Sequence, residues 1–147
     1  MKTILIVDDE EPNRFYLETL FKTQGFRVIS TANGVEALEA ARNNPPNIII
    51  SDILMPVMDG FMLCKACKND ATLNTIPFIF YTATYTDAKD EKLAMELGAD
   101  LFLVRPQEPD VLLDVIHKFS SDTGRGLENK LKTSVSEEKI LKEYNES

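Results

Sequence analysis

Two stretches, ILIVDD at residues 4–9 and IIISD at residues 48–52, decide the fold of this chain. Each is a short apolar run rich in β-branched side chains that ends in acid. Such runs predict strands that are buried on both faces, and therefore parallel strands covered by helices. In an open parallel sheet, ligands bind beyond the carboxyl ends of the strands. The two stretches therefore predict that their acids face a binding site.

The acids at these strand ends are Asp8, Asp9 and Asp52. Carboxylates that are packed together repel one another unless a cation joins them. Mg²⁺ is a hard cation that takes carboxylate, carbonyl and water oxygens as ligands. We therefore expect a metal-dependent site for phosphoryl chemistry at this edge of the sheet.

The rest of the main domain alternates between strand and helix patterns. Strands are expected at 3–8, 26–29, 47–52, 77–82 and 101–104, and helices follow them, with Pro12 near the first helix start, Asn33 as a cap, and Gly25 and Gly98 as helix ends. Repeated strand-helix units predict an α/β fold with a doubly wound, five-stranded parallel sheet and helices on both faces.

The length of 147 residues suits one domain, which we place at residues 1–119. Residues 120–147 begin with a polar linker of small residues that includes glycine, and they continue with apolar residues at helical spacing. We expect a C-terminal helix that leads to a further domain in a longer protein. A disordered terminus is the alternative.

Charge and hydropathy limit the partners and the cellular location that the sequence predicts. The net charge is −8, and residues 1–119 hold 11 basic against 18 acidic side chains, which argues against direct nucleic-acid binding. The sequence has neither a signal-like N-terminus nor an apolar run long enough for a membrane span, so a cytoplasmic location is expected.

Two further polar residues follow predicted strands, Thr82 and Arg105. Asp52 can act as a nucleophile on phosphorus and form an acyl phosphate. Thr82 offers a hydroxyl donor to a bound phosphoryl group, and Arg105 offers a fixed positive charge with two parallel donors. Capping acids and a strand-end hydroxyl would explain each residue alone, but the combination favours a phosphoryl site.

The chain resembles the receiver domain of two-component response regulators over residues 1 to about 119. The matching pieces are Ile4–Glu10, Asp52 with Met55–Gly60, Thr82-Ala83, Gly98–Asp100 and Phe102–Pro106. The resemblance implies the flavodoxin-like strand order 2-1-3-4-5, and a cis peptide bond before Pro106.

The resemblance also implies a role for each site residue. Asp52 would accept a phosphoryl group, with Mg²⁺ or Mn²⁺ bound by Asp9, Asp52 and the backbone carbonyl of Leu54, and with Asp8 acting through metal-bound water. Thr82 and Phe102 would form the switch, in which Phe102 swings inward as Thr82 moves toward the phosphoryl group.

The partners implied are a sensor histidine kinase or phosphotransfer domain, which donates the phosphoryl group, and a downstream output domain or protein. The face of the fourth helix, fifth strand and fifth helix would report the change, and this face or the C-terminal helix would carry a homodimer. The domain would not be a turnover enzyme, although it would catalyse its own phosphorylation and dephosphorylation.

One residue departs from the family pattern. Arg105 stands where the family nearly always has lysine, and arginine is bulkier and planar. Arg105 then either pairs with the phosphoryl group, or swings out and slows phosphorylation, or marks a module that signals by contact alone.

Three other functions fit the sequence less well. A flavodoxin-like electron carrier would need a phosphate-cradling loop where this chain has acids at residues 8–11. A phosphatase of the haloacid dehalogenase type would need a second acid two residues after Asp52, where Leu54 stands. The CxxC motif Cys64–Cys67 lies inside a predicted helix and lacks a second ligand pair, which favours two ordinary thiols.

Overall fold

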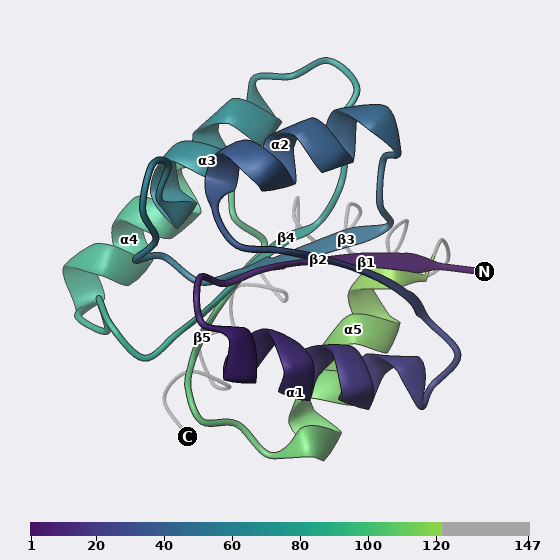
Figure 1. The fold of residues 1–147 in the computed structure, drawn as a ribbon. Coiled ribbons are helices and arrows are strands. Elements are labelled where there is room, and N and C mark those ends of the chain that lie inside the picture. The colour runs from purple at the N-terminus through teal and green to yellow at the C-terminus, as the bar shows by residue number, and fades with distance from the viewer. Residues whose placement is uncertain (122–147) are drawn as a thin grey trace.

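Strands and helices alternate along residues 1–121, the part of the chain that the computed structural model describes (Figure 1). The elements are β1 (Thr3–Val7), α1 (Glu11–Lys22), β2 (Arg27–Thr31), α2 (Gly34–Asn43), β3 (Ile48–Ser51), α3 (Gly60–Lys68), β4 (Phe78–Thr82), α4 (Ala88–Glu96), β5 (Leu101–Val104) and α5 (Pro109–Ser120). The predicted tail lies outside the described residues, except for Ser120 and Ser121.

The five strands form one parallel sheet in the order β2-β1-β3-β4-β5, as predicted. β1 lies between β2 and β3, and Ile4 is opposite both Val28 and Ile48. The order reverses beside β1, so the carboxyl ends of β1 and β3 border the crevice where ligands bind in such sheets.

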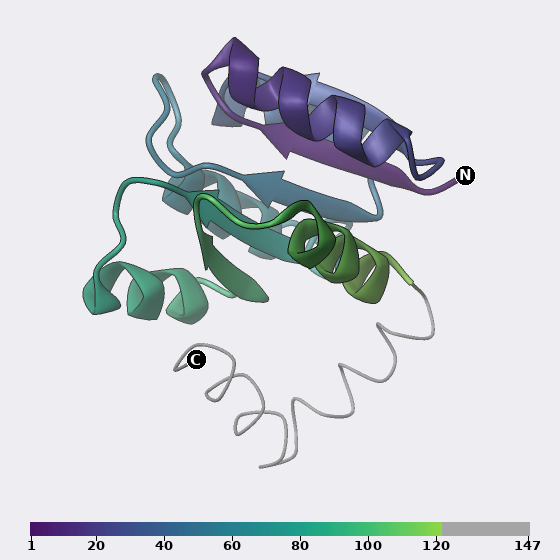
Figure 2. The same cartoon turned by 90° about the horizontal axis from the view of Figure 1, so that it is seen from below.

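Helices cover both faces of the sheet. α2, α3 and α4 lie on one face, and α1 and α5 lie on the other (Figures 1 and 2). Alternate residues of β1 and β3 serve the two faces: Leu5 and Ile49 belong to the core under α2 and α3, while Ile4 and Ile48 belong to the core under α1 and α5. Burial on both faces explains why these strands are continuous apolar runs.

The strands and most of the helix caps that the sequence predicts are present in the structure. The side chain of Asn33 accepts a hydrogen bond from the Glu36 N–H at 3.0 Å and caps α2. Gly98 has φ of +105° after α4, a conformation that suits glycine. The prediction for β2 is wrong at both ends, since the strand begins one residue later and ends two later. β2 is an edge strand with partly exposed residues, so its apolar pattern marks the ends poorly.

None of the helices within residues 1–121 is long and apolar enough to cross a membrane.

Candidate functional site

The predicted site residues meet at the carboxyl edge of the sheet. Asp8 directly follows β1, Asp52 follows β3, Thr82 ends β4 and Arg105 follows β5. Because all these strands are parallel and adjacent, their last residues reach the same edge. The structure thus brings together side chains that are up to 97 positions apart in the sequence.

Asp8, Asp9 and Asp52 form an acidic cluster in which one carboxylate oxygen from each lies within 4.8 Å of the others. Asp8 and Asp52 are 3% and 6% exposed, whereas Asp9 is exposed to solvent. The cluster therefore joins two buried carboxylates to one that faces the opening.

Each buried carboxylate accepts a backbone hydrogen bond and pairs with Arg105. Oδ1 of Asp8 accepts the Glu10 N–H at 2.9 Å, and Oδ1 of Asp52 accepts the Ile53 N–H at 2.7 Å. The remaining oxygens face Arg105, whose Nη1 is 3.4 Å from Oδ2 of Asp8 and whose Nη2 is 3.0 Å from Oδ2 of Asp52. Arg105 is therefore turned inward as the counter-ion of both acids.

Burial raises the pKa of both Asp8 and Asp52 above the ordinary value of 3.8. Removal from water penalises the charged form, and this penalty exceeds the opposing effects of the backbone hydrogen bonds and of Arg105. A single arginine thus leaves the two carboxylates short of positive charge.

The hydroxyl of Thr82 is fully buried and donates a 2.6 Å hydrogen bond to the carbonyl of Thr84. The Thr84 N–H donates back to the Thr82 Oγ1 at 3.1 Å, which ties the hydroxyl to the loop after β4. Phe102 lies opposite Phe80 across β4 and β5, is 6% exposed, and packs into the core under α2, α3 and α4. The aromatic ring of the predicted switch is therefore already inward in this structure.

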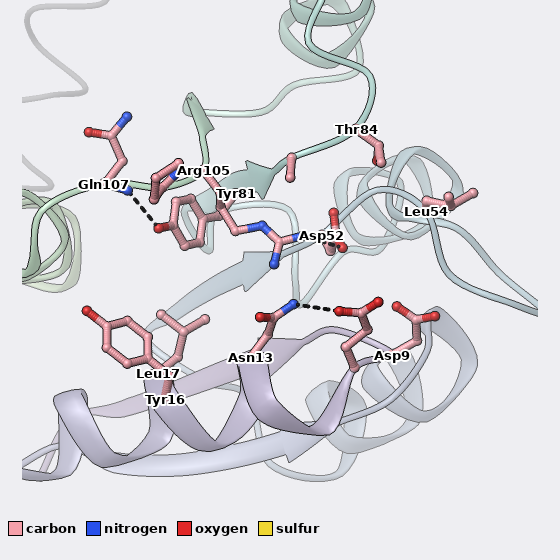
Figure 3. A pocket seen from close by; sticks show the side chains of 13 residues that line it. Asp9, Asn13, Tyr16, Leu17, Asp52, Leu54, Tyr81, Thr84, Arg105 and Gln107 are labelled. Atoms are coloured by element: carbon pink, nitrogen blue, oxygen red, sulfur yellow. Dashed lines mark hydrogen bonds and ion pairs between the residues drawn. The ribbon is translucent and has the colours of Figure 1, made fainter.

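A cavity of about 530 Å³ opens beside the acids, between α1 and the loops that follow β4 and β5 (Figure 3). Its lining includes Asp9, Asp52, Leu54, Arg105 and the ring of Tyr81. The Leu54 side chain is 53% exposed at the rim. The cavity therefore gives Asp52 an opening to solvent.

The family model of the response regulator receiver domain matches residues 4–117. The chain belongs to this family. The predicted cis bond between Arg105 and Pro106 is present, which agrees with the resemblance. Receiver domains are signalling modules of two-component systems, not conventional enzymes.

Several curated relatives and solved structures are similar to this receiver domain. A probable transcriptional regulator, ycf27 of Porphyridium aerugineum, is 38% identical over 109 residues, which are 74% of this chain and 44% of that protein. The response regulator PleD of Caulobacter vibrioides is 38% identical over 111 residues, which are 75% of this chain and 24% of that protein. The chain thus spans less than half the length of these relatives.

Among solved structures, the signal receiver domain of a histidine kinase from Syntrophus aciditrophicus has a TM-score of 0.76 and 34% identity, covering 82% of this chain and 90% of that one. The chemotaxis response regulator CheY4 of Vibrio cholerae has a TM-score of 0.75 and 31% identity, covering 81% and 98%. These likenesses agree with the observed strand order.

The sequence alone missed three residues that shape the receiver site. Arg14 on α1 donates a 2.7 Å hydrogen bond to the backbone carbonyl of Asp8. Gly60 begins α3 so close to β3 that a Cβ there would overlap the backbone carbonyl of Asp52. Tyr81 lies beside Arg105, and only the strand register reveals this contact.

The two cysteines are free and buried in α3, as ordinary thiols should be. Burial raises the pKa of Cys64 to about 12 and that of Cys67 to about 11. Neither thiol therefore has the character of a redox or metal-binding group.

Proposed function

We propose that this receiver domain accepts a phosphoryl group on Asp52 from a phosphohistidine of a sensor kinase or phosphotransfer domain. The observation that supports this most is the convergence of Asp52 with two further acids, a buried hydroxyl and an inward arginine at one sheet edge. Each of these groups has a use in phosphoryl transfer, and together they have few other uses.

In the transfer, a carboxylate oxygen of Asp52 attacks phosphorus in line with the bond to the donor imidazole. The P–N bond breaks, its electron pair stays on the imidazole nitrogen, and an acyl phosphate forms. Arg105 is placed to pair with phosphoryl oxygens, because its Nη2 already lies 3.0 Å from Asp52. Dephosphorylation would be a separate attack, in which water adds to phosphorus, the bond to the Asp52 oxygen breaks with its electron pair returning to the carboxylate, and inorganic phosphate leaves.

The acidic cluster suits Mg²⁺ or Mn²⁺. Its donors are hard oxygens that lie within 4.8 Å of one another. Burial raises the pKa of Asp8 and Asp52 because it penalises their charged forms, and a bound cation would offset that penalty. Asp9, Asp52 and the carbonyl of Leu54 would hold the ion, and Asp8 would act through water. When bound, the ion neutralises and orients the phosphoryl oxygens.

The switch would begin at Thr82. Its hydroxyl can leave the Thr84 carbonyl and donate to a phosphoryl oxygen, which would release the loop after β4. The surface of α4, β5 and α5 would change with this loop, and the Phe102 ring, which already packs inward, would then be held there. This surface exposes Leu93 and Val104 at 41% and 39%, so an output domain, a partner protein or a second copy has apolar side chains to contact.

Two alternatives remain for the experiment to separate. The domain signals by contact alone if Arg105 prevents phosphorylation. It is a phosphatase with an aspartate nucleophile if it turns over phosphate esters, although Leu54 offers no general acid two residues after Asp52. A cytoplasmic location, action without direct nucleic-acid contact and a further domain after residue 119 stay predictions of the sequence.

The test is the intact mass of the protein after incubation with Mg²⁺ and a small phosphodonor such as acetyl phosphate. We expect one labile phosphoryl adduct in the native chain and in Asp114→Asn, which changes an exposed acid of α5. The adduct should be absent in Asp52→Asn. An adduct that persists in Asp52→Asn would refute the assignment, and a chain that takes up none under any condition would favour signalling by contact.

A further inference from the structure

Arg105 and Tyr81 are diagonal neighbours on adjacent strands. Tyr81 is opposite Leu103 in the β4–β5 register, and Arg105 follows two residues later, so both side chains start on the face that α1 and α5 cover. The Arg105 N–H donates to the Thr82 carbonyl at 2.8 Å, which continues the strand pairing past the end of β5. Cζ of Arg105 lies 5.8 Å from the centroid of the Tyr81 ring.

The Tyr81 ring is itself held firmly. The residue is 6% exposed and belongs to the core under α1 and α5. Its hydroxyl accepts the Gln107 N–H at 3.0 Å (Figure 3). The Gln107 side chain donates to the Val104 carbonyl at 2.9 Å. The ring is thus fixed on β4 at one end and on the loop after Pro106 at the other.

Besides the Tyr81 ring, the guanidinium of Arg105 contacts the two buried carboxylates of the site. Its two terminal nitrogens meet Asp8 and Asp52, while its buried Nε has no hydrogen-bond partner among the described residues. The Arg105 side chain passes the Tyr81 ring on its way to Asp52 (Figure 3). Within residues 1–121, the Arg105 guanidinium therefore lies against the Tyr81 ring and the two carboxylates that it neutralises.

We propose that Tyr81 is a positioning residue that holds Arg105 on the Asp8–Asp52 pair, and that this hold sets how tightly the acidic site binds a divalent cation. The second half rests on the proposed function, in which the same carboxylates bind Mg²⁺. Arg105 and a divalent cation draw on the same Asp52 carboxylate, so a firmer hold on Arg105 weakens cation binding.

The pairing is specific to arginine. A guanidinium is planar and weakly hydrated and stacks on aromatic faces, whereas a lysine ammonium is a compact, strongly hydrated charge on a flexible stem. Contact of a cation with a partly buried ring changes an equilibrium by about two- to fivefold. Loss of the Tyr81 ring should therefore matter when arginine stands at position 105 and much less when lysine does.

The first measurement follows the Nε–H signal of Arg105 in ¹H–¹⁵N spectra of the chain in EDTA, with Arg105→Lys as the assignment control. The nearby ring should shift this signal, and Tyr81→Phe should retain the shift because it keeps the ring. Tyr81→Leu should move the signal toward that of a solvated arginine. An unchanged signal in Tyr81→Leu, with folding verified by circular dichroism, would overturn the positioning role without reference to metal or phosphate.

The second measurement is calorimetric titration of the same chains with MgCl₂. Tyr81→Leu should tighten Mg²⁺ binding by about threefold in the native background and change it by less than about twofold in the Arg105→Lys background. Tyr16→Leu, which removes another tyrosine of the same cavity, is the matched control and should leave affinity unchanged. An equal effect of Tyr81→Leu in both backgrounds would show that Tyr81 acts only through general packing. It would overturn the proposed link between the Tyr81–Arg105 contact and Mg²⁺ affinity.

The two measurements separate this inference from the proposed function. Absence of Mg²⁺ binding in every variant would overturn the metal site and the affinity half of the inference together. The Nε–H signal would still decide whether Tyr81 positions Arg105.

Discussion

Asp52→Asn should make the metal-free domain more stable, although it removes an ion pair. The substitution keeps the shape of the side chain and the acceptor for the Ile53 N–H, and it deletes one charge. Its effect therefore depends on whether the surroundings of Asp52 favour or oppose that charge.

The Coulomb contributions nearly cancel. At an effective dielectric constant of about 20, the Arg105 contact at 3.0 Å is worth about 5.5 kcal/mol to the charge on Asp52. Repulsion from Asp8, within 4.8 Å, costs at least about 3.5 kcal/mol, and the exposed Asp9 adds about 1 kcal/mol at the dielectric constant of water. The desolvation of Asp52 then decides the balance, in agreement with its raised pKa.

Desolvation of a buried charge costs several kcal/mol, which exceeds the net Coulomb gain of about 1 kcal/mol, so we expect Asp52→Asn to gain about 1–2 kcal/mol in the free energy of unfolding. Because the folded pKa of Asp52 is raised, the folded state binds more protons than the unfolded state above pH 3.8. The stability of the native chain should fall as the pH rises from 3.8 through that raised pKa, and less steeply in Asp52→Asn.

The assay is urea denaturation in EDTA at pH 7 and across the acidic range, with Asp114→Asn as the control for the loss of an exposed acid. Mg²⁺ at ten times its dissociation constant should then add about 1.4 kcal/mol to the native chain and much less to Asp52→Asn. A loss of more than about 1 kcal/mol in metal-free Asp52→Asn would show that the ion pair outweighs desolvation and refute the reasoning.

Three further substitutions or treatments test other parts of the structure. Gly60→Ala should cost about 1–3 kcal/mol in urea denaturation and weaken phosphorylation, because the added methyl meets the carbonyl of Asp52; wild-type behaviour would contradict this packing. Asp100→Ala should cost about 2 kcal/mol, because Oδ2 of Asp100 accepts the buried Phe78 N–H at 2.8 Å; a neutral result would mean that this bond contributes little. Cys64 should react with iodoacetamide at neutral pH only as fast as the protein opens, because burial raises its pKa to about 12; rapid alkylation of the native chain would count against its burial.

The sequence predicts the fold well because its decisive elements are local patterns. Strand β5 begins and ends where the apolar run 101–104 predicts, and the buried runs in β1 and β3 require helices on both faces. β1, β3 and β4 differ from the prediction by one residue at one or both ends, and β2 differs most. Most of β2 is partly exposed, whereas the other edge strand, β5, is mostly buried, so the apolar pattern marks the ends of β2 poorly.

The site is predictable in part for the same reason. Parallel strands bring Asp8, Asp52, Thr82 and Arg105 to one edge, and this needs only the strand assignments. The contact between Tyr81 and Arg105 needs the β4–β5 register as well. The inward rotamer of Arg105 and the bond from Thr82 to the Thr84 carbonyl depend on side-chain choices that no spacing encodes.

The charge of the site links its resting form to its proposed reaction. Three carboxylates and Arg105 sum to −2, the charge that one divalent cation cancels. Under the proposed function, the acyl phosphate carries roughly two negative charges in place of the single charge of Asp52. The phosphorylated site, with Arg105 included, therefore sums to roughly −3, so Arg105 and one divalent cation together still leave about one negative charge. Arg105 would then pass from the carboxylates to the phosphoryl oxygens, and the Tyr81 ring, which touches its guanidinium in the resting form, lies where it can influence how readily that transfer occurs.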